Sequence, residues 1–206
     1  MNILCIDTST RSNWIGLYSD GKITDSVGYQ DRQSCLVNLM PSIKMVLDNA
    51  QTALAQLDGI ATVIGPGTWS SLRIGAATVK QLCLVNQIPL FAISNNDLMV
   101  ENLLRKDLSQ KHILAVMDAQ NKKVYSALYS VENGIKSRIS DYQWEDADKL
   151  SEGIPPEIDD LLITGDGAHH FENRLRPGWQ VEHSMPQHDS AYLAILGSLA
   201  EATQPT

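Results

Sequence analysis

One pattern occurs twice in this chain: an apolar run that ends in aspartate, followed by a polar turn and a second strand-like run. It reads "ILCID" at residues 3–7 and "ILAVMD" at residues 113–118. Two later features follow in the same order at a similar offset. "GLYSDG" (16–21) is matched by "ALYSVENG" (127–134), and "ATVIGPGT" (61–68) is matched by "LLITGDGA" (161–168). Matches in one order at nearly constant spacing indicate a duplicated unit, so we expect two related halves.

Each half is expected to combine strands with helices. Short apolar and β-branched runs bounded by Gly, Asp and Ser predict strands. In the first half these runs are residues 2–7, 14–18, 22–29, 59–65 and 89–94. Apolar residues at helical spacing predict helices at about 33–49 and 70–85, with a kink or a late start at Pro41. The expected fold class is α/β, with a mixed sheet flanked by helices in each half.

A polar segment separates the two halves. It is "RKDLSQK" at residues 105–111, so we expect an N-terminal half at 1–106 and a C-terminal half at 107–206. A last helix is predicted at 191–202, "AYLAILGSLAEA". This helix can pack on either half, including back on the N-terminal half.

The composition is that of an ordinary globular protein, and it limits the function. Of the 206 residues, 43% are hydrophobic and 19% are charged, and no apolar run approaches the roughly 20 residues of a membrane span. The start "MNILCIDTST" lacks a basic leader, so we expect a cytoplasmic protein without a membrane partner. The net charge of −8 disfavours a protein that binds nucleic acid without a partner protein, because phosphate contacts need clustered Lys and Arg.

No residue cluster predicts a metal site. Cys5, Cys35 and Cys83 lie in apolar contexts without CxxC spacing, which indicates buried hydrophobic side chains. His169 and His170 are adjacent in sequence, and adjacent side chains are expected to project in different directions. No third ligand stands at a recognisable spacing from them.

The two strand-ending aspartates are typical of a nucleotide-binding fold, but the turns after them are not. Two halves of this kind are similar to the fold of actin, sugar kinases and heat-shock-70 ATPases, in which ATP lies between the halves. Working members use glycine in these turns, because backbone N–H groups must approach phosphate oxygens. Turns 7–12 and 118–123 contain no glycine. We expect Asp7 and Asp118 to accept backbone N–H bonds in their own turns. The alternative is a residual nucleotide contact by Asp7, Thr8 and Asp118.

The segment "IGPGTWSSLRIG" (64–75) looks like a phosphate cradle but lacks its chemistry. It has no Gly-Lys-Ser/Thr ending, Ser70 replaces the third glycine of a dinucleotide fingerprint, and Pro66 removes an N–H group. We interpret it as a strand-to-helix corner, made by Gly65, Gly67, Trp69 and Arg73. Thr68 or Ser70 is expected to cap the helix, which contributes about 1 kcal/mol. Trp69 is expected to point outward or against the other half.

The helix behind this corner has two mildly apolar faces with Gly and Ala among their residues. One face is expected to lie on its own sheet. The other face either meets a partner helix or is buried within the same domain.

Three segments resemble the TsaB/YeaZ family. They are "ILCIDTST" at the start, "IGPGTWSSLRIGAATVKQL" in the middle and "VMDAQNKKVYSALY" in the second half. The usual family forms are approximately ILAIDTST, GPGSFTGLRIG and DARxxEVY, so this chain departs from the middle motif at Trp69, Ser70 and Ser71. The resemblance implies the duplicated actin-like fold. It also implies a non-catalytic role beside TsaD, the paralogue that transfers threonylcarbamoyl to adenosine in bacterial tRNA, with TsaE as the associated ATPase.

The resemblance further implies partners and a docking surface. No catalytic residue, metal or cofactor is expected on this chain. ATP and a metal would be bound by partner subunits, and tRNA would be bound only through the complex. The two N-terminal helices would dock the TsaD-type subunit. The contact residues would be Leu36, Leu39, Met40, Ile43, Leu47, Ile74, Ala77, Thr78 and Gln81. Without its partner, the chain is expected to form a homodimer through the same helices.

Two other functions stay open at this point. One is an enzyme of the same fold, either an ATP-dependent kinase or a peptidase-like protein. The glycine-free turns oppose a kinase, and no Ser or Cys nucleophile with a base is recognisable for a peptidase. The other is an autonomous tRNA binder, which the negative charge opposes.

Overall fold

The computed structural model spans residues 1–206 and describes all of them except 11, 31–33, 107–108, 184–191 and 193–206. The chain divides into two compact units. Unit 1 holds Met1–Asn95 together with Tyr192, and unit 2 begins at Asn96 and includes the described residues up to His183. In the described part of the chain, every helix is too short or too polar to cross a membrane.

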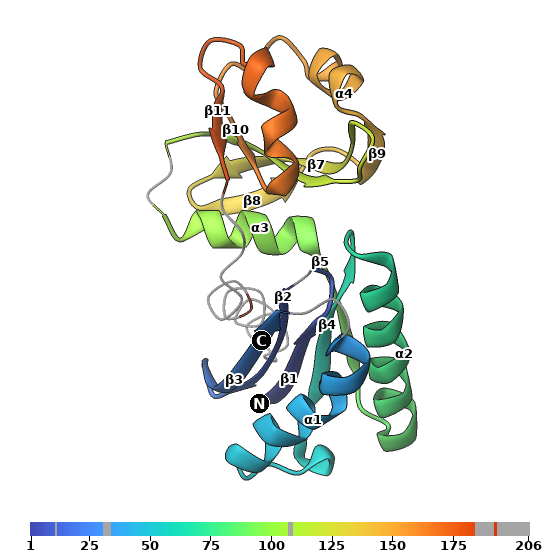
Figure 1. The fold of residues 1–206 in the computed structure, drawn as a ribbon. Coiled ribbons are helices and arrows are strands. Elements are labelled where there is room, and N and C mark those ends of the chain that lie inside the picture. Colours follow the sequence, from blue (N-terminus) through green and yellow to red (C-terminus); the bar gives the residue numbers. More distant parts are fainter. Residues whose placement is uncertain (11, 31–33, 107–108, 184–191, 193–206) are drawn as a thin grey trace. The chain divides into compact units, whose positions relative to one another are not determined.

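The described part of unit 1 is built on a five-stranded mixed sheet (Figure 1). Its strands are β1 (Asn2–Asp7), β2 (Ser12–Ser19), β3 (Lys22–Gln30), β4 (Gly59–Gly65) and β5 (Leu90–Ser94), in the spatial order β3-β2-β1-β4-β5. β1 pairs antiparallel with β2 and parallel with β4. The connecting helices are α1 (Ser34–Asn49), the short 3-10 helix η1 (Leu54–Gln56) and α2 (Trp69–Asn86).

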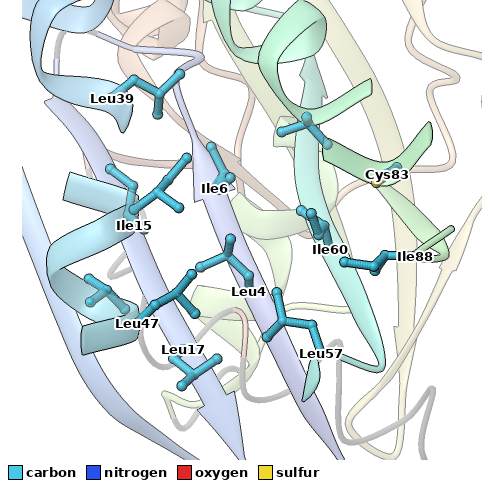
Figure 2. Packing of buried hydrophobic residues seen from close by; sticks show 13 residues of the cluster. Leu4, Ile6, Ile15, Leu17, Leu39, Leu47, Leu57, Ile60, Cys83 and Ile88 are labelled. Carbon is cyan, nitrogen blue, oxygen red and sulfur yellow. The ribbon is translucent and has the colours of Figure 1, made fainter. Parts of the chain in front are cut away.

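The core of unit 1 lies between its sheet and the helices α1 and α2. Because side chains alternate along a strand, Leu4 and Ile6 of β1 lie on the same face, and both belong to this core (Figure 2). Ile43 of α1 and Val79 of α2 pack into the same cluster. Each such buried side chain contributes about 1.5–3 kcal/mol. α1 begins at Ser34, ahead of its internal Pro41. Of the two predicted alternatives, the late start is therefore wrong, and the kink stays a prediction.

Unit 2 repeats the topology of unit 1. Its described strands are β6 (His112–Asp118), β7 (Lys123–Glu132), β8 (Ile135–Arg138), β9 (Gln143–Asp146), β10 (Leu161–Thr164) and β11 (Gln180–Glu182). Their order is β11-β10-β6-β7-β8, and β9 also pairs with β7. β6 is antiparallel to β7 and parallel to β10, as β1 is to β2 and β4. Five strands correspond one to one, so the predicted duplication is confirmed.

The repeated hairpin has a simple cause in its turn residues. Asp20 and Gly21 join β2 to β3 with φ of 49° and 84°, and Asn133 and Gly134 join β7 to β8 with φ of 52° and 76°. Two consecutive left-handed residues make the tight hairpin turn whose twist suits paired strands. Asp, Asn and Gly tolerate this conformation best, which explains why "SDG" and "ENG" recur.

The helices of the two units differ more than their sheets do. Unit 2 has α4 (Ala147–Gly153) and the 3-10 helix η2 (Asp166–Arg174). After the Gly-x-Gly loop, unit 1 carries the 18-residue α2, whereas unit 2 carries only the 9-residue η2. A long helix behind this loop is therefore a feature of unit 1 within the described residues.

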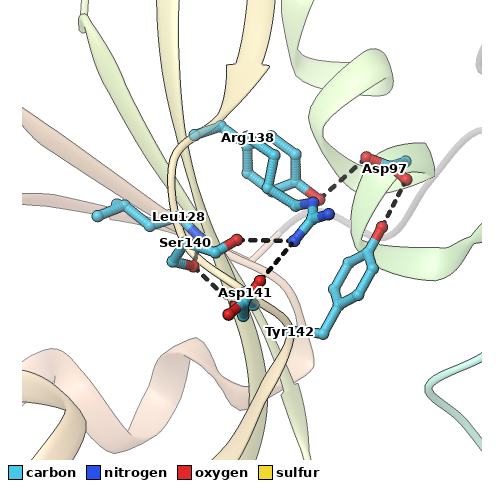
Figure 3. A network of polar contacts seen from close by, with 7 residues as sticks. Asp97, Leu128, Arg138, Ser140, Asp141 and Tyr142 are labelled. Atoms are coloured by element: carbon cyan, nitrogen blue, oxygen red, sulfur yellow. Dashed lines mark hydrogen bonds and ion pairs between the residues drawn. The ribbon is translucent and has the colours of Figure 1, made fainter.

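The helix α3 (Asn95–Leu104) packs on the sheet of unit 2. Met99, Val100 and Leu103 lie in one cluster with residues of β6, β7 and β10. The Asp97 carboxylate accepts hydrogen bonds from the hydroxyls of Tyr129, at 3.0 Å, and Tyr142, at 2.9 Å (Figure 3). The units consequently divide between Asn95 and Asn96, whereas the sequence analysis places the division after residue 106. The apolar pattern of α3 does not indicate which sheet covers it.

Tyr192 is the described residue of the predicted terminal helix 191–202. Its side chain is fully buried and stacks on Trp14 with ring centroids 5.0 Å apart. Its hydroxyl donates a hydrogen bond to the carbonyl oxygen of Ile6 at 3.3 Å. Tyr192 thus packs on the sheet of unit 1; the other residues of the predicted helix lie outside the described residues.

Candidate functional site

The turn after β1, which we call the first turn (residues 7–10), is buried and closed by its aspartate. Asp7 is 1% exposed, and its Oδ1 accepts a hydrogen bond from the backbone N–H of Ser9 at 2.7 Å. Thr8 and Ser9 are buried as well. The expected bond within the turn is confirmed. A nucleotide contact by Asp7 and Thr8 stays a prediction.

The corner residues pack directly on the first turn. A Cβ added to Gly67 would lie 2.2 Å from the carbonyl oxygen of Ser9, and the N–H of Thr68 donates to that oxygen at 2.6 Å. A Cβ added to Gly75 would lie 2.1 Å from Oγ1 of Thr8. Close approach of the loop and of α2 to the first turn therefore explains these glycines.

Asn95 joins the corner to the first turn. Its side chain is 1% exposed, and its Nδ2 donates to Oγ of Ser9 at 2.8 Å and to the carbonyl oxygen of Pro66 at 3.2 Å. The sequence analysis singled out neither Asn95 nor Ser9. An asparagine directly after a strand was the available signal, since such a position suits a side chain that bonds to neighbouring backbone.

Trp69 and Arg73 lie on the outer surface of the corner. Trp69 is 76% exposed, and the guanidinium carbon of Arg73 lies 5.7 Å from the centroid of its ring. Thr68 occupies the N-cap position of α2, but its side chain makes no cap hydrogen bond. The prediction that Thr68 is the N-cap residue is therefore confirmed, but the side-chain hydrogen bond expected of a cap does not form.

Unit 2 has an equivalent arrangement around Asp118. Its Oδ1 accepts the N–H of Gln120 at 2.9 Å, so the prediction for this carboxylate is confirmed too. The N–H of Asp118 donates to Oδ1 of Asp166 at 2.9 Å. A Cβ added to Gly167 would lie 2.9 Å from the carbonyl carbon of Met117, which again places a Gly-x-Gly loop against the end of a central strand.

Burial raises the pKa of the Asp166 carboxyl, and the nearby negative charge of Asp118 adds to this increase. The N–H bond from Asp118 acts in the opposite direction, because it stabilises the ionised form. More than a third of the residue's surface is nevertheless exposed, so the group responds to solvent.

The His169 and His170 rings lie together, contrary to expectation. Their centroids are 3.9 Å apart, and the two ring planes are inclined by 39°. Nε2 of His170 lies 3.3 Å from Oδ1 of Asp118, and Nδ1 of His169 lies 2.7 Å from the carbonyl oxygen of Asp166. Within the described residues, no three His, Cys, Asp or Glu side chains are placed to hold a metal ion.

The predicted docking residues divide into exposed and buried groups. Leu39, Ile43 and Leu47 are buried in the core of unit 1, so these three assignments are corrected: they face their own sheet. Ile74 and Thr78 are partly buried, whereas Met40, Ala77 and Gln81 are exposed. The side chain of Leu36 lies outside the described residues. The sequence analysis missed further exposed apolar residues on these helices, namely Val37, Met45, Leu84 and Val85.

Comparison with known proteins shows the family to which the chain belongs. The family model described as TsaD, tRNA N6-adenosine threonylcarbamoyltransferase, matches residues 32–202. The tRNA threonylcarbamoyladenosine biosynthesis protein TsaB of Bacillus subtilis is 30% identical over 199 residues, which cover 96% of this chain and 78% of that protein. The chain belongs to the TsaB/YeaZ family. The TsaB protein of Escherichia coli K12 is also 30% identical, over 66% of this chain.

The matches to several curated TsaB relatives are partial. The chain spans 58% of the length of the Escherichia coli protein and 57% and 61% of two Buchnera aphidicola proteins. The activity and partners of those whole proteins are therefore only proposed for this chain.

Solved structures agree with the family in fold. A Pseudomonas aeruginosa protein described as similar to peptidase YeaZ has a TM-score of 0.83 and 23% identity, and the match covers 100% of this chain and 94% of that one. A Listeria monocytogenes protein described as a candidate N-acetylmannosamine kinase has a TM-score of 0.55 and 12% identity, covering 98% and 100% of the two chains. The fold is thus the duplicated actin-like fold that sugar kinases share.

Proposed function

We propose that the chain is a non-catalytic subunit in the synthesis of threonylcarbamoyladenosine in tRNA. The observation that carries the proposal is the similarity to the Bacillus subtilis TsaB protein over 96% of this chain and 78% of that protein, whose name states this pathway. The match to the TsaD family model supports a relationship to the catalytic transferase. ATP, a metal and tRNA would then be bound chiefly by TsaD-type and TsaE-type partners.

The first turn supports a role without catalysis. In nucleotide-binding relatives of the fold, this turn must present backbone N–H groups to phosphates. Here the N–H of Ser9 is donated to Asp7, and the carbonyl oxygen of Ser9 is occupied by Thr68 of the corner. Packing of Gly67 against Ser9 closes the same place. A phosphate would have to displace these contacts.

The docking surface for the TsaD-type paralogue is proposed to lie on α1 and α2. Both helices cover the same core, and both carry exposed apolar side chains. Val37, Met40 and Met45 are exposed on α1, and Leu84 and Val85 on α2. Exposed apolar residues gathered on neighbouring helices are typical of a partner interface, and the same surface would form a homodimer when the partner is absent.

Charged substitutions on this surface test the docking. Met40→Asp and Leu84→Asp are each expected to weaken association with the TsaD-type protein at least about tenfold, since each places a charge in an apolar interface. Ile135→Asp is the control, because Ile135 is an apolar residue of unit 2 that is at least as exposed as Met40 and Leu84. Unchanged association of both helix variants in a pull-down would contradict the docking surface.

The pathway itself needs a separate measurement. Depletion of the protein is expected to reduce threonylcarbamoyladenosine in digested tRNA, and unchanged nucleoside content would contradict the proposal.

Calorimetric titration of the isolated chain with magnesium ATP tests the kinase alternative. Clear binding that depends on magnesium would favour an enzyme. In gel filtration, a strict monomer without the partner would contradict the homodimer.

A further inference from the structure

The strand β5 lies at an edge of the sheet of unit 1. It pairs with β4 on one side, and no strand of the described residues pairs with its other side. Edge strands leave backbone N–H and C=O groups unpaired, and proteins commonly protect them with charged residues, proline or a very short strand. β5 spans five residues, Leu90–Ser94, and none of them is charged or proline. This edge is therefore open to a further strand.

The other edge strands in the described part of the chain carry charged residues. These are Lys22 and Asp25 in β3, Lys136 and Arg138 in β8, Glu145 and Asp146 in β9, and Glu182 in β11. By contrast, the whole segment 86–96 around β5 contains no charged residue. Among the described strands, β5 is thus the edge that lacks this protection.

The register of β5 on β4 identifies the backbone groups that point outward. The N–H of Ile60 donates to the carbonyl oxygen of Pro89 at 2.9 Å, and Ile60 is the register partner of Leu90. In a parallel pair, alternate residues of a strand bond to the neighbouring strand. Pro89 and every second residue after it therefore bond to β4. The N–H and C=O groups of Leu90 and Ala92 point away from β4.

The side chains of β5 leave these outward groups accessible. Leu90 is 47% exposed, and Ala92 is exposed as well. The ring of Phe91, which stands between them, lies over β4, because a Cβ added to Gly59 would overlap Cε2 of this ring. Pro89 lacks its N–H on the side that faces β4, so it removes no outward donor.

The edge is complementary to a second copy of itself. When two such strands pair antiparallel about a two-fold axis, Leu90 of each copy can stand opposite Ala92 of the other. Each opposed pair then exchanges two N–H···O=C bonds, which satisfies the outward groups of both residues. Residues near a two-fold axis meet their own copies, so a charged strand would repel itself there. The uncharged segment 86–96 avoids this repulsion.

We propose that two copies of this chain pair antiparallel through β5, so that their unit 1 sheets form one continuous sheet. The contact uses the backbone of an edge strand, and it is therefore separate from the helix surface proposed to dock the TsaD-type subunit. It goes beyond the proposed function and does not depend on it.

The test is sedimentation of the isolated chain with Met40→Asp and Leu84→Asp, which place charges in the helix surface and oppose association there. We expect this chain still to form a dimer. Ala92→Pro in addition removes an outward N–H but no bond to β4, and it is expected to raise the dissociation constant of the dimer at least about tenfold. Ala92→Thr is the matched control, because it keeps the N–H and suits a strand. It should change the constant by less than about twofold.

A second variant keeps the test decisive if the proline disturbs folding, which circular dichroism detects. Ala92→Lys keeps every backbone bond to β4 and brings like charges together across the two-fold axis, so the same increase is expected. A monomer in the doubly charged background overturns the proposal. A dimer that the folded Ala92 variants do not weaken overturns it as well. Neither a partner nor tRNA is used, so these outcomes are independent of the pull-down and nucleoside measurements that test the proposed function.

Discussion

The carbonyl oxygen of Ser9 lies 2.2 Å from the place that a Cβ would take on Gly67. Gly67→Ala must therefore push the corner away from the first turn. We expect a loss of about 1–3 kcal/mol in the stability of unit 1, as for other over-packed buried sites. Amide hydrogen exchange in β1 reports this loss locally, and each 1.4 kcal/mol speeds exchange about tenfold where opening and closing are fast compared with exchange.

Gly153→Ala is the matched control for this substitution. Gly153 is the last residue of α4. Apart from its chain neighbours and the backbone of its own helix, no atom of the described residues lies within 4 Å of a Cβ added to Gly153. An alanine there is expected to be neutral or slightly stabilising. Equal exchange rates in Gly67→Ala and wild type would show that the first turn can move away without cost.

Asn95→Ala is expected to destabilise unit 1 by about 1–3 kcal/mol, because it removes the donor to the buried hydroxyl of Ser9 and to the partly buried carbonyl oxygen of Pro66. Asn86→Ala removes a comparable side-chain bond, to the carbonyl oxygen of Leu82, from an exposed position. It should change stability by less than about 0.5 kcal/mol. Thermal unfolding followed by tryptophan fluorescence compares the two variants. Similar losses from both would contradict the buried role of Asn95.

Tyr129→Phe should cost more than Tyr142→Phe. Both hydroxyls donate to Asp97, but Tyr129 is buried whereas Tyr142 is 51% exposed. Loss of the buried bond is expected to cost about 1 kcal/mol, and loss of the exposed bond about half of that or less. Urea unfolding measures both values. A larger loss from Tyr142→Phe would show that the exposed ring, rather than the buried one, holds α3 on the sheet.

The same tyrosine predicts an alkaline limit to the stability of unit 2. Burial, followed by the negative charge of Asp97, raises the pKa of Tyr129 well above its ordinary value of 10.0. The folded state therefore holds the phenolic proton more tightly than the unfolded state does. Its contribution is complete below pH 10 and is lost as the pH rises beyond that value. In Tyr129→Phe this part of the alkaline decline should be absent, and an unchanged decline would assign it to other groups.

Asp166→Asn is expected to stabilise unit 2 slightly at neutral pH. The raised pKa of Asp166 means that the folded state disfavours its ionised form, mainly through burial and then through Asp118. Asparagine keeps an acceptor for the N–H of Asp118 without the charge. Solvent exposure limits the gain to less than about 1 kcal/mol. In acid the Asp166 carboxyl is protonated and is then as uncharged as the asparagine side chain. The gain should therefore vanish as the pH falls below 3.8, the ordinary pKa of this carboxyl. Stability curves against pH check this sign, and a gain that persists in acid would contradict it.

Local signals predicted most of the framework. The alternation in "ILCID" and the turn residues of "SDG" depend on neighbours a few positions apart, and such signals survive in the folded chain. The hydrogen bond from Ser9 to Asp7 is equally local, and it was predicted. The contact of Asn95 with Ser9 joins two distant segments, so no local pattern indicated it.

The helices show where pattern alone is ambiguous. Leu39 and Met40 are neighbours in one apolar run, and only the position of the sheet decides that Leu39 is buried while Met40 is exposed. The sequence analysis placed residues 96–104 in the N-terminal half, whereas the packing of α3 with β6 and β7 puts them in unit 2.

The sequence by itself determined the duplication, the hairpin turns and the family, because each depends on short-range patterns or on direct similarity. The tertiary structure alone decided the division at Asn95, the exposed face of α2 and the burial of the first turn under Gly67. Those features depend on which surfaces exclude water together, and that is a property of the assembled sheet and helices rather than of any one segment.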